Sequence, residues 1–283
     1  MVKASEGVRE LKEILSKAGI DDAGFEVGLL VKHVTGKSRF DTEEFSLQEW
    51  NLLQSLVARR ATRYPLQYLV QTWPFMELEL AVGPGVLIPR PETETVCLAA
   101  IKEIRALFAP AVLDLCAGTG ALALGIARHV PGAVVTAVEF SKEAFFYLQK
   151  NIAAYVKTAK NPPVAVLADA IGYQRQLLPE SLDLVVSNPP YVTEEEYAAL
   201  APELYHEPRL ALVAGEEGLY FYRQLAGLYK DSLKPGGRIV FETGDRQAAA
   251  VEKILMQAGY IAIGRLPDMA GKDRVVKAQK KTA

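Results

Sequence analysis

The chain has 283 residues, half of them hydrophobic, so it can bury a sizeable core, and wholesale disorder is excluded. Its 32 basic and 34 acidic residues nearly cancel, giving a formal net charge of −2. This balance argues against a protein whose main task is to grip bare DNA or RNA, although residues 58–63 (ARRATR) are a candidate for a local basic patch.

Cysteine usage and hydropathy indicate the compartment. The two cysteines, Cys97 and Cys116, form no Cys-X-X-Cys pair, which is typical of a reducing environment. Residues 1–15 are charged and lack an apolar signal core, and the most apolar stretch, 107–127, contains Asp114 and several glycines. We therefore expect a soluble cytoplasmic protein that contacts no membrane. The histidines are scattered, and we expect no metal site.

The first part of the chain has the pattern of a small helical domain, which we assign to residues 1–72. Apolar residues recur at helical spacing in 7–19, 22–36 and 46–63, and we expect helices only. The domain would be followed by a segment of different character.

Residues 73–94 alternate between apolar and polar side chains, as a short β-hairpin does. We place the turn of this hairpin at Gly83-Pro84-Gly85, and a proline-flanked loop follows it. We predict that 73–90 are a β-hairpin linker between two domains.

From residue 91 to residue 283, helices and strands alternate. Seven apolar segments have the character of strands: 111–116, 133–140, 164–169, 182–188, 237–244, 260–266 and 273–279. Amphipathic helices separate all but the last two, which are close enough to pair as an antiparallel hairpin. The pattern predicts an α/β domain with a largely parallel sheet covered on both faces.

A glycine turn follows the first of these strands in LDLCAGTG (113–120). Gly118 and Gly120 let the backbone approach a ligand closely, at the strand ends where open α/β sheets bind ligands. The loop has no Lys-Ser/Thr pair and is not a phosphate-binding P-loop. Asp114, inside the strand, would repel a pyrophosphate but attract a cationic amino-acid group.

Two more acidic residues end the next two strands. Glu139 lies 19 residues after Gly120, about the spacing at which a carboxylate binds both hydroxyls of a ribose. Asp169 could accept a hydrogen bond from an exocyclic amine. Ribose, amine and cationic amino acid together describe S-adenosylmethionine better than NAD. Alternatively, each carboxylate could be a solvated strand end or a helix cap.

The fourth strand ends in SNPPY (187–191), which has an unusual set of chemical groups. Asn188 supplies a carbonyl acceptor, Pro189 and Pro190 have no N–H to donate, and Tyr191 offers a flat ring. Such a site suits a planar, conjugated NH2 group: a glutamine amide, N6 of adenine, N2 of guanine or N4 of cytosine. Acceptors that hold its two hydrogens would favour a localised nitrogen lone pair aimed at a methyl donor.

NPPY and LDLCAGTG together resemble the amino-methylating class of S-adenosylmethionine-dependent methyltransferases. Other stretches (PLQYLV, VLIPRPETE, YHEPRLALVAGEEGLYFYR and DMAGKDRVV) are similar to the HemK/PrmC family. That family methylates N5 of the glutamine in the Gly-Gly-Gln motif of class I peptide-chain release factors. The resemblance, which covers about 60–276, implies a Rossmann-like, seven-stranded methyltransferase domain at 91–283 and a helical N-terminal domain that recognises the substrate protein.

The resemblance also implies site residues. Cofactor contacts would come from Asp114, Cys116, Ala117, Gly118, Thr119, Gly120, Glu139, Asp169, Ala170 and Asn188. Catalytic and substrate contacts would come from Asn188, Pro189, Pro190 and Tyr191, with Arg90 and Glu92 shaping the pocket. The family usually has Gly where Cys116 stands and Asp where Glu139 stands, so we expect altered affinity but retained function.

Three other functions stay open from the residues. A sister family with the same NPPY methylates a glutamine of a ribosomal protein. A nucleic-acid amino-methyltransferase shares the chemistry but should carry a basic surface. A non-catalytic module that only docks on a translation factor should have lost Asn188 or the glycine loop. We expect a monomer that binds release factors as protein substrates and binds no nucleic acid directly.

Overall fold

The computed structural model describes residues 1–157 and 161–282. By its internal contacts the chain divides into two units, the first made of Met1–Trp73 with Ala201–His206, the second of Pro74–Leu200 with Glu207–Ala283. The roles assigned above to 1–72, 73–90 and 91–283 stay predictions. Among the described residues no helix is both long enough and apolar enough to cross a membrane.

The first unit is built around helices, as expected. They are α1 (Ala4–Lys17), α2 (Ala23–Thr35), α3 (Leu47–Ala61) and α4 (Leu66–Val70). Their apolar faces form one buried cluster that includes Leu11, Leu30, Leu53 and Val57. The side chain and backbone of Ser46 exchange hydrogen bonds with those of Glu49, which fixes the start of α3.

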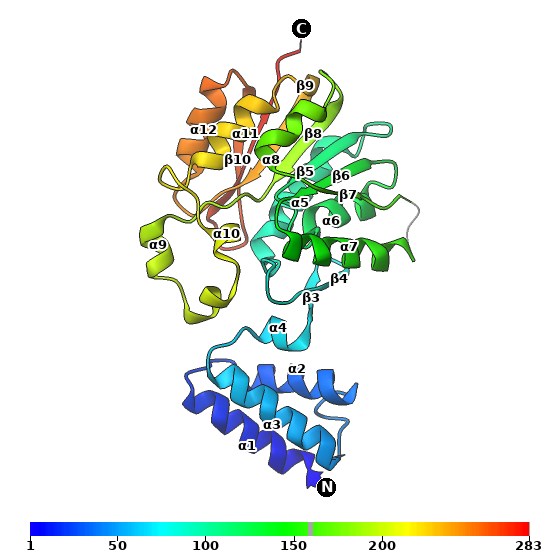
Figure 1. Ribbon diagram of the computed structural model, residues 1–283, viewed down its shortest axis with the longest axis vertical. Helices are drawn as coiled ribbons and strands as arrows, with labels where there is room; N and C mark the ends of the chain where they lie inside the picture. The colour runs from blue at the N-terminus through cyan, green and yellow to red at the C-terminus, as the bar shows by residue number, and fades with distance from the viewer. Residues whose placement is uncertain (158–160, 283) are drawn as a thin grey trace. The chain divides into compact units, whose positions relative to one another are not determined.

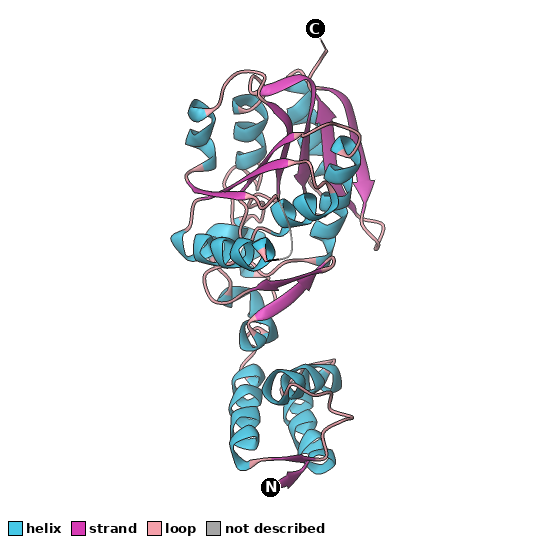
Figure 2. Ribbon diagram, turned by 90° about the vertical axis from the view of Figure 1, so that its right-hand side faces the viewer, coloured by secondary structure: helices cyan, strands magenta, loops and turns pink. Residues whose placement is uncertain are grey.

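The expectation of helices only was wrong in one detail. A two-stranded sheet pairs β1 (Val2–Lys3) with β2 (Glu44–Phe45), near the N-terminus in Figure 2. Phe45 of this sheet is fully buried and stacks on Trp50. Strands of two residues are too short to show an alternating pattern in the sequence.

A distant segment belongs to the first unit. Residues Ala201–His206, which include the short 3-10 helix Pro202–His206, carry Glu203 to the arginines of ARRATR. Arg60 binds Glu26 at 2.6 Å and Glu203 at 3.0 Å, and Arg63 binds Glu203 at 2.8 Å. Two of the three arginines of this motif are thus used in ion pairs within the unit, and the third, Arg59, lies over the Tyr64 ring. The motif is therefore a poor candidate for a phosphate-binding patch.

The second unit contains the predicted seven-stranded sheet. Its strands are β5 (Ala111–Leu115), β6 (Val134–Glu139), β7 (Val164–Leu167), β8 (Leu182–Ser187), β9 (Leu233–Glu242), β10 (Ile261–Pro267) and β11 (Asp273–Gln279). The spatial order is β10-β11-β9-β8-β5-β6-β7. Pairs from β9 to β7 are parallel, and β11 pairs antiparallel with both β9 and β10. This confirms the predicted fold and its terminal antiparallel hairpin.

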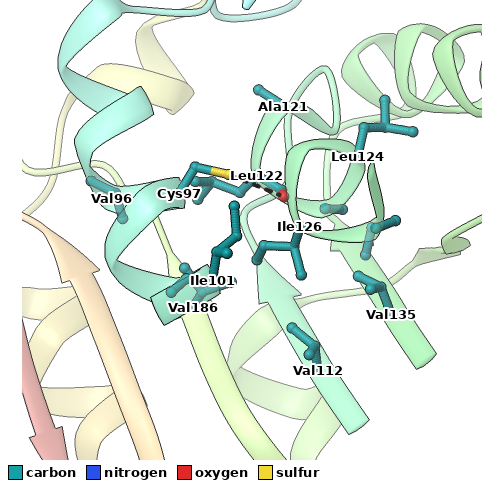
Figure 3. Packing of buried hydrophobic residues seen from close by; sticks show 14 of the residues in the cluster. Val96, Cys97, Ile101, Val112, Ala121, Leu122, Leu124, Ile126, Val135 and Val186 are labelled. Carbon is teal, nitrogen blue, oxygen red and sulfur yellow. Dashed lines mark hydrogen bonds between the residues drawn. The ribbon is translucent and has the colours of Figure 1, made fainter. Parts of the chain in front are cut away.

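Helices cover both faces of this sheet (Figure 1). One layer contains α5 (Pro91–Ile104), α6 (Ala121–His129) and α7 (Lys142–Val156), and the other contains α8 (Ala170–Tyr173), α11 (Tyr220–Leu228) and α12 (Ala248–Gln257). Figure 3 shows α5 and α6 meeting over the strands, where Cys97 and Leu122 touch. Two short helices, α9 (Glu194–Ala198) and α10 (Arg209–Leu212), lie in the connection after β8.

The predicted hairpin exists, but its turn was misplaced. Strands β3 (Thr72–Phe75) and β4 (Leu78–Ala81) turn at Met76, whose φ is +50°, and the glycines follow β4. A Cβ at Gly83 would lie 2.2 Å from the Tyr147 hydroxyl, and one at Gly85 would lie 2.7 Å from Cβ of Glu143. These glycines therefore serve close packing against α7 and not the turn.

Candidate active site

A cavity of about 290 Å³ lies in the second unit, where β5, β6, β7 and β8 end. Eleven of the predicted site residues line it: Arg90, Asp114, Cys116, Ala117, Gly118, Thr119, Glu139, Asp169, Ala170, Asn188 and Pro190. Gly120, Pro189, Tyr191 and Glu92 are not among the lining residues. The sheet topology thus brings together segments that are far apart in the chain, as ligand sites in open α/β sheets require.

The loop after β5 has a strained backbone that shapes one wall. Cys116, Gly118 and Gly120 all have positive φ, at +60°, +55° and +83°. Gly120 does not line the cavity, but a Cβ there would lie 2.6 Å from Cδ1 of Leu148, so glycine is needed for packing. Cys116 occupies a left-handed conformation that glycine adopts without cost.

Asp114 lies fully buried beneath this loop. Its Oδ2 accepts a hydrogen bond from the backbone N–H of Ala123 at 3.0 Å, while its Oδ1 has no partner among the described residues. Burial, with a smaller contribution from the charge of Glu139, raises the pKa of Asp114 to about 8. A buried acceptor without a partner in a cavity wall fits a cationic ligand group.

Glu139 and Asp169 end the second and third strands, as the sequence indicates. Glu139 accepts hydrogen bonds from the N–H groups of Gly118 and Ser141, both at 2.7 Å, and burial raises its pKa. Asp169 accepts from the N–H of Ile171 at 2.9 Å and caps α8. Each carboxylate therefore shapes a loop of the cavity wall, and each has lone pairs to offer a ligand.

Residues 188–191, called the acceptor loop below, follow β8 on the same edge of the sheet. Asn188 and Pro190 line the cavity, whereas Pro189, which is buried as Pro190 is, does not. Tyr191 lines a second cavity of about 250 Å³ with Gln247 and Arg274. Both polar groups of the Tyr191 backbone are hydrogen-bonded. Its N–H donates to the carbonyl of Leu212 at 3.1 Å, and its carbonyl accepts from Nε2 of Gln247 at 2.8 Å.

Three buried residues near this loop were missed by the sequence analysis. Thr93 accepts a hydrogen bond from Nδ2 of Asn188 at 3.3 Å and donates one to Glu242 at 2.6 Å. Glu207 binds the guanidinium of Arg90 and accepts from the N–H of Ile88 at 2.9 Å. Two sequence features could have pointed to these residues. Thr93 lies in the PETE segment, and Glu242 ends a strand as Glu139 does.

Arg90 and Glu92 have different surroundings. Arg90 lines the cavity and is held by Glu207, so its charge is already compensated at the wall. Glu92 lies off the cavity, and its charge acts on Glu242 and Arg274. Only Arg90 is therefore placed to shape the pocket directly.

The arrangement can bind two groups side by side. The half of the cavity around Asp114 and Gly118 offers buried acceptors and a closely approached backbone. The half around Asn188 and Pro190 offers the groups of the acceptor loop, which has few donors. Such a site can place an amine-bearing acceptor next to a cationic ligand.

Comparisons with known proteins agree with this geometry. Residues 6–70 match the model of the PrmC N-terminal domain, and residues 95–220 match that of the methyltransferase small domain. The release factor glutamine methyltransferase of Streptomyces coelicolor is 35% identical, with 96% of each chain covered. That of Deinococcus radiodurans is also 35% identical, with 94% of each chain covered.

A solved methyltransferase of Pyrococcus furiosus shares the fold. It matches with a TM-score of 0.54 and 18% identity, over 81% of this chain and 98% of that one. The full-length sequence similarity confirms the resemblance predicted from the motifs. The chain belongs to the release factor glutamine methyltransferase family.

Proposed function

We propose that this protein transfers a methyl group from S-adenosylmethionine to N5 of the glutamine in the Gly-Gly-Gln motif of class I release factors. The observation that carries the proposal is the position of Asn188 and Pro190 in the wall of the same cavity as the loop 116–120. Similarity over 96% of the chain to a release factor glutamine methyltransferase supports the substrate.

The residues of the cavity fit the cofactor. S-adenosylmethionine, when bound, supplies an electrophilic methyl group on a positively charged sulfur. Asp114 would bind its amino group, because Oδ1 is a buried acceptor that has no partner among the described residues. Gly118 would allow close backbone approach, and Glu139 and Asp169 would bind the ribose and the adenine amine. The longer Glu139, in place of the usual Asp, should alter affinity and not prevent binding.

The acceptor loop has to make an amide nitrogen nucleophilic. The lone pair of an amide is delocalised into the carbonyl, with a barrier to rotation of roughly 18–20 kcal/mol in a peptide bond. Oδ1 of Asn188 and a proline carbonyl would accept the two hydrogens of the glutamine amide, which favours a localised lone pair. The Tyr191 ring would cover the amide plane. After transfer the methylated nitrogen is cationic and releases a proton to water, so no general base is needed beforehand.

Methyl label identifies the acceptor. The protein is incubated with S-adenosylmethionine labelled in its methyl group and a lysate that lacks this activity, and the labelled residue is mapped by mass spectrometry. Label on the glutamine of a Gly-Gly-Gln motif supports the proposal. Label on a glutamine of a ribosomal protein supports the sister activity instead, and label on a nucleobase, an oxygen or a ring carbon refutes both.

The first unit is proposed to hold the release factor while its glutamine enters the site. A single glutamine on a loop offers little binding energy, so a separate surface is needed. Phe25 and Phe40 of this unit are 62% and 83% exposed. Replacing both with alanine should lower kcat/KM about tenfold on whole release factor and leave a short Gly-Gly-Gln peptide unaffected.

Phe108→Ala is the matched control, because Phe108 belongs to the second unit and is fully exposed. An equal loss on protein and peptide in the double variant would contradict a docking role for this surface. We further propose that the protein acts as a monomer, which sedimentation of the purified chain can check.

A further inference from the structure

One buried carboxylate is linked to both side chains of the acceptor loop. Glu242, the last residue of β9, is 1% exposed. Its Oε1 accepts a hydrogen bond from the Tyr191 hydroxyl at 3.2 Å, and its Oε2 accepts one from the Thr93 hydroxyl at 2.6 Å. The Thr93 oxygen in turn accepts from Nδ2 of Asn188 at 3.3 Å. The chain of contacts runs from Asn188 to Tyr191 through Glu242.

The direction of these hydrogen bonds follows from the carboxylate. An ionised carboxylate can only accept, so the Thr93 hydroxyl must donate to it and can offer Asn188 only lone pairs. The amide of Asn188 must then turn its NH2 toward Thr93, which leaves Oδ1 as the acceptor for a substrate. The Tyr191 ring is fixed in the same way, because its O–H is committed to the other carboxylate oxygen.

We propose that ionised Glu242 is a positioning residue that, through Thr93, holds the Asn188 amide in the acceptor orientation and fixes the Tyr191 ring. This proposal rests on the function proposed above. Neither Glu242 nor Thr93, which itself lines the cavity, is assigned a catalytic contact. Both would act through Asn188 and Tyr191, the two residues proposed to contact the acceptor.

The carboxylate is itself held in place. The backbone carbonyl of Glu242 accepts a hydrogen bond from the hydroxyl of Tyr222 at 2.9 Å, and Tyr222 is fully buried. Thr93 lies in the first turn of α5 and is 4% exposed. Because Glu242 and Thr93 are both held in place, a shift of either side chain cannot easily compensate for loss of the Glu242 charge.

The proposal implies a pH dependence near neutrality. The titratable and charged groups that face Glu242 are Tyr191 from the loop after β8, Arg274 from β11, Glu92 from α5 and Tyr222 from α11. Burial raises the pKa of Glu242 to about 7, against the hydrogen bonds of Thr93 and Tyr191 and the charge of Arg274. Protonated Glu242 could donate to Thr93, and Thr93 could then donate to Oδ1 of Asn188, which would reverse the amide.

The test compares Thr93→Val, Thr93→Ser, Glu242→Gln and the double variant Thr93→Val/Glu242→Gln. Wild type is assayed from pH 6 to pH 9 with labelled S-adenosylmethionine and recombinant release factor. Its kcat should fall as the pH decreases through about 7, since the ionised form is the active one. Glu242→Gln should lower kcat about tenfold at pH 8 and remove that fall, with the dissociation constant of S-adenosylmethionine changed less than about twofold.

Thr93→Val removes only the hydroxyl and should also lower kcat about tenfold, whereas Thr93→Ser keeps the hydroxyl and should retain near-normal kcat. The double variant should lose no more than the larger single loss, since both changes break the same link. Additive losses, or a Glu242→Gln enzyme with the pH profile of wild type, would overturn the proposal.

If Glu242→Gln fails to fold, the Thr93 pair decides, because equal kcat in the valine and serine variants would also overturn it. Failure of the proposed function is distinguishable from all of these outcomes. In that case wild type itself would place no label on the release factor glutamine.

Discussion

Two buried carboxylates lie behind the two halves of the site, and their hydrogen bonds differ. Asp114, on the cofactor side, accepts one hydrogen bond and has an oxygen without a partner among the described residues. Glu242, on the acceptor side, has both oxygens engaged, by Thr93 and Tyr191. Burial raises the pKa of both, to about 8 and about 7. We infer that the cofactor side is completed by a cationic ligand, whereas the acceptor side is organised in advance.

Among these predictions, removal of the Asn188 side chain should have the largest effect on kcat, because it disrupts the acceptor side of the site. We expect Asn188→Ala to lower kcat at least about 10²-fold, the loss typical of one preorganised hydrogen-bonding partner in a transition state. Single-turnover kinetics with saturating cofactor and release factor measure this. The melting temperature serves as the control for folding, and near-normal turnover in a folded variant would show that the amide does not align the nucleophile.

Removal of the charge of Asp114 should instead break the cofactor side. We expect Asp114→Asn to weaken binding of S-adenosylmethionine about 10- to 100-fold, because the asparagine cannot ionise beside the cationic amino group as the Asp114 carboxyl can. Isothermal titration calorimetry measures the affinity. Asp183→Asn is the matched control, because Asp183 lies on the neighbouring strand β8, where it binds the N–H of Ala111 and Lys234. Equal losses in both variants would contradict a specific contact.

The same substitution should have the opposite effect on stability at high pH. The pKa of Asp114 rises from 3.8 to about 8 on folding, so its favourable contribution is complete below about pH 4 and is lost as the pH rises to about 8. Without cofactor, Asp114→Asn should therefore gain stability relative to wild type as the pH rises, by about 1.4 kcal/mol for each pH unit between about 5 and 8, with no further gain to pH 9. Thermal melts across this range measure the difference, and a constant difference would refute burial of the charge.

Much of the fold could be predicted because its signals are local. The apolar runs of the strands and the apolar spacing of the helices are visible in the sequence, and all seven predicted strands form. The turn at Met76 was missed because glycine marks both turns and close contacts, and the role of Gly83 depends on Tyr147, which is distant in the chain. The placement of 201–206 in the first unit depends on Glu203 meeting Arg60, which no local pattern encodes.

The residues of the candidate site also fall into two groups: those that a local motif predicts and those that only the fold brings together. The position of Asn188 and Gly118 in the cavity wall could be predicted, because each is part of a continuous motif whose chemical groups indicate a binding site. Thr93 and Glu242 could not, because their role exists only where α5 and β9 meet behind the acceptor loop. The contact roles of the predicted residues stay predictions until ligand binding to the variants is measured.

The smallest expected effect concerns the loop on the cofactor side, where Cys116 has a φ of +60°. A residue with a Cβ is strained there by roughly 1–2 kcal/mol, and glycine is not, although glycine also makes the unfolded chain more flexible. Cys116→Gly should therefore be more stable than the matched variant Cys116→Ala by about 1 kcal/mol, because both lose the thiol and only one loses the strain. Thermal unfolding of the two variants measures this difference. If the alanine variant is as stable as the glycine variant, the loop relaxes without cost, and the left-handed conformation at this position carries no strain.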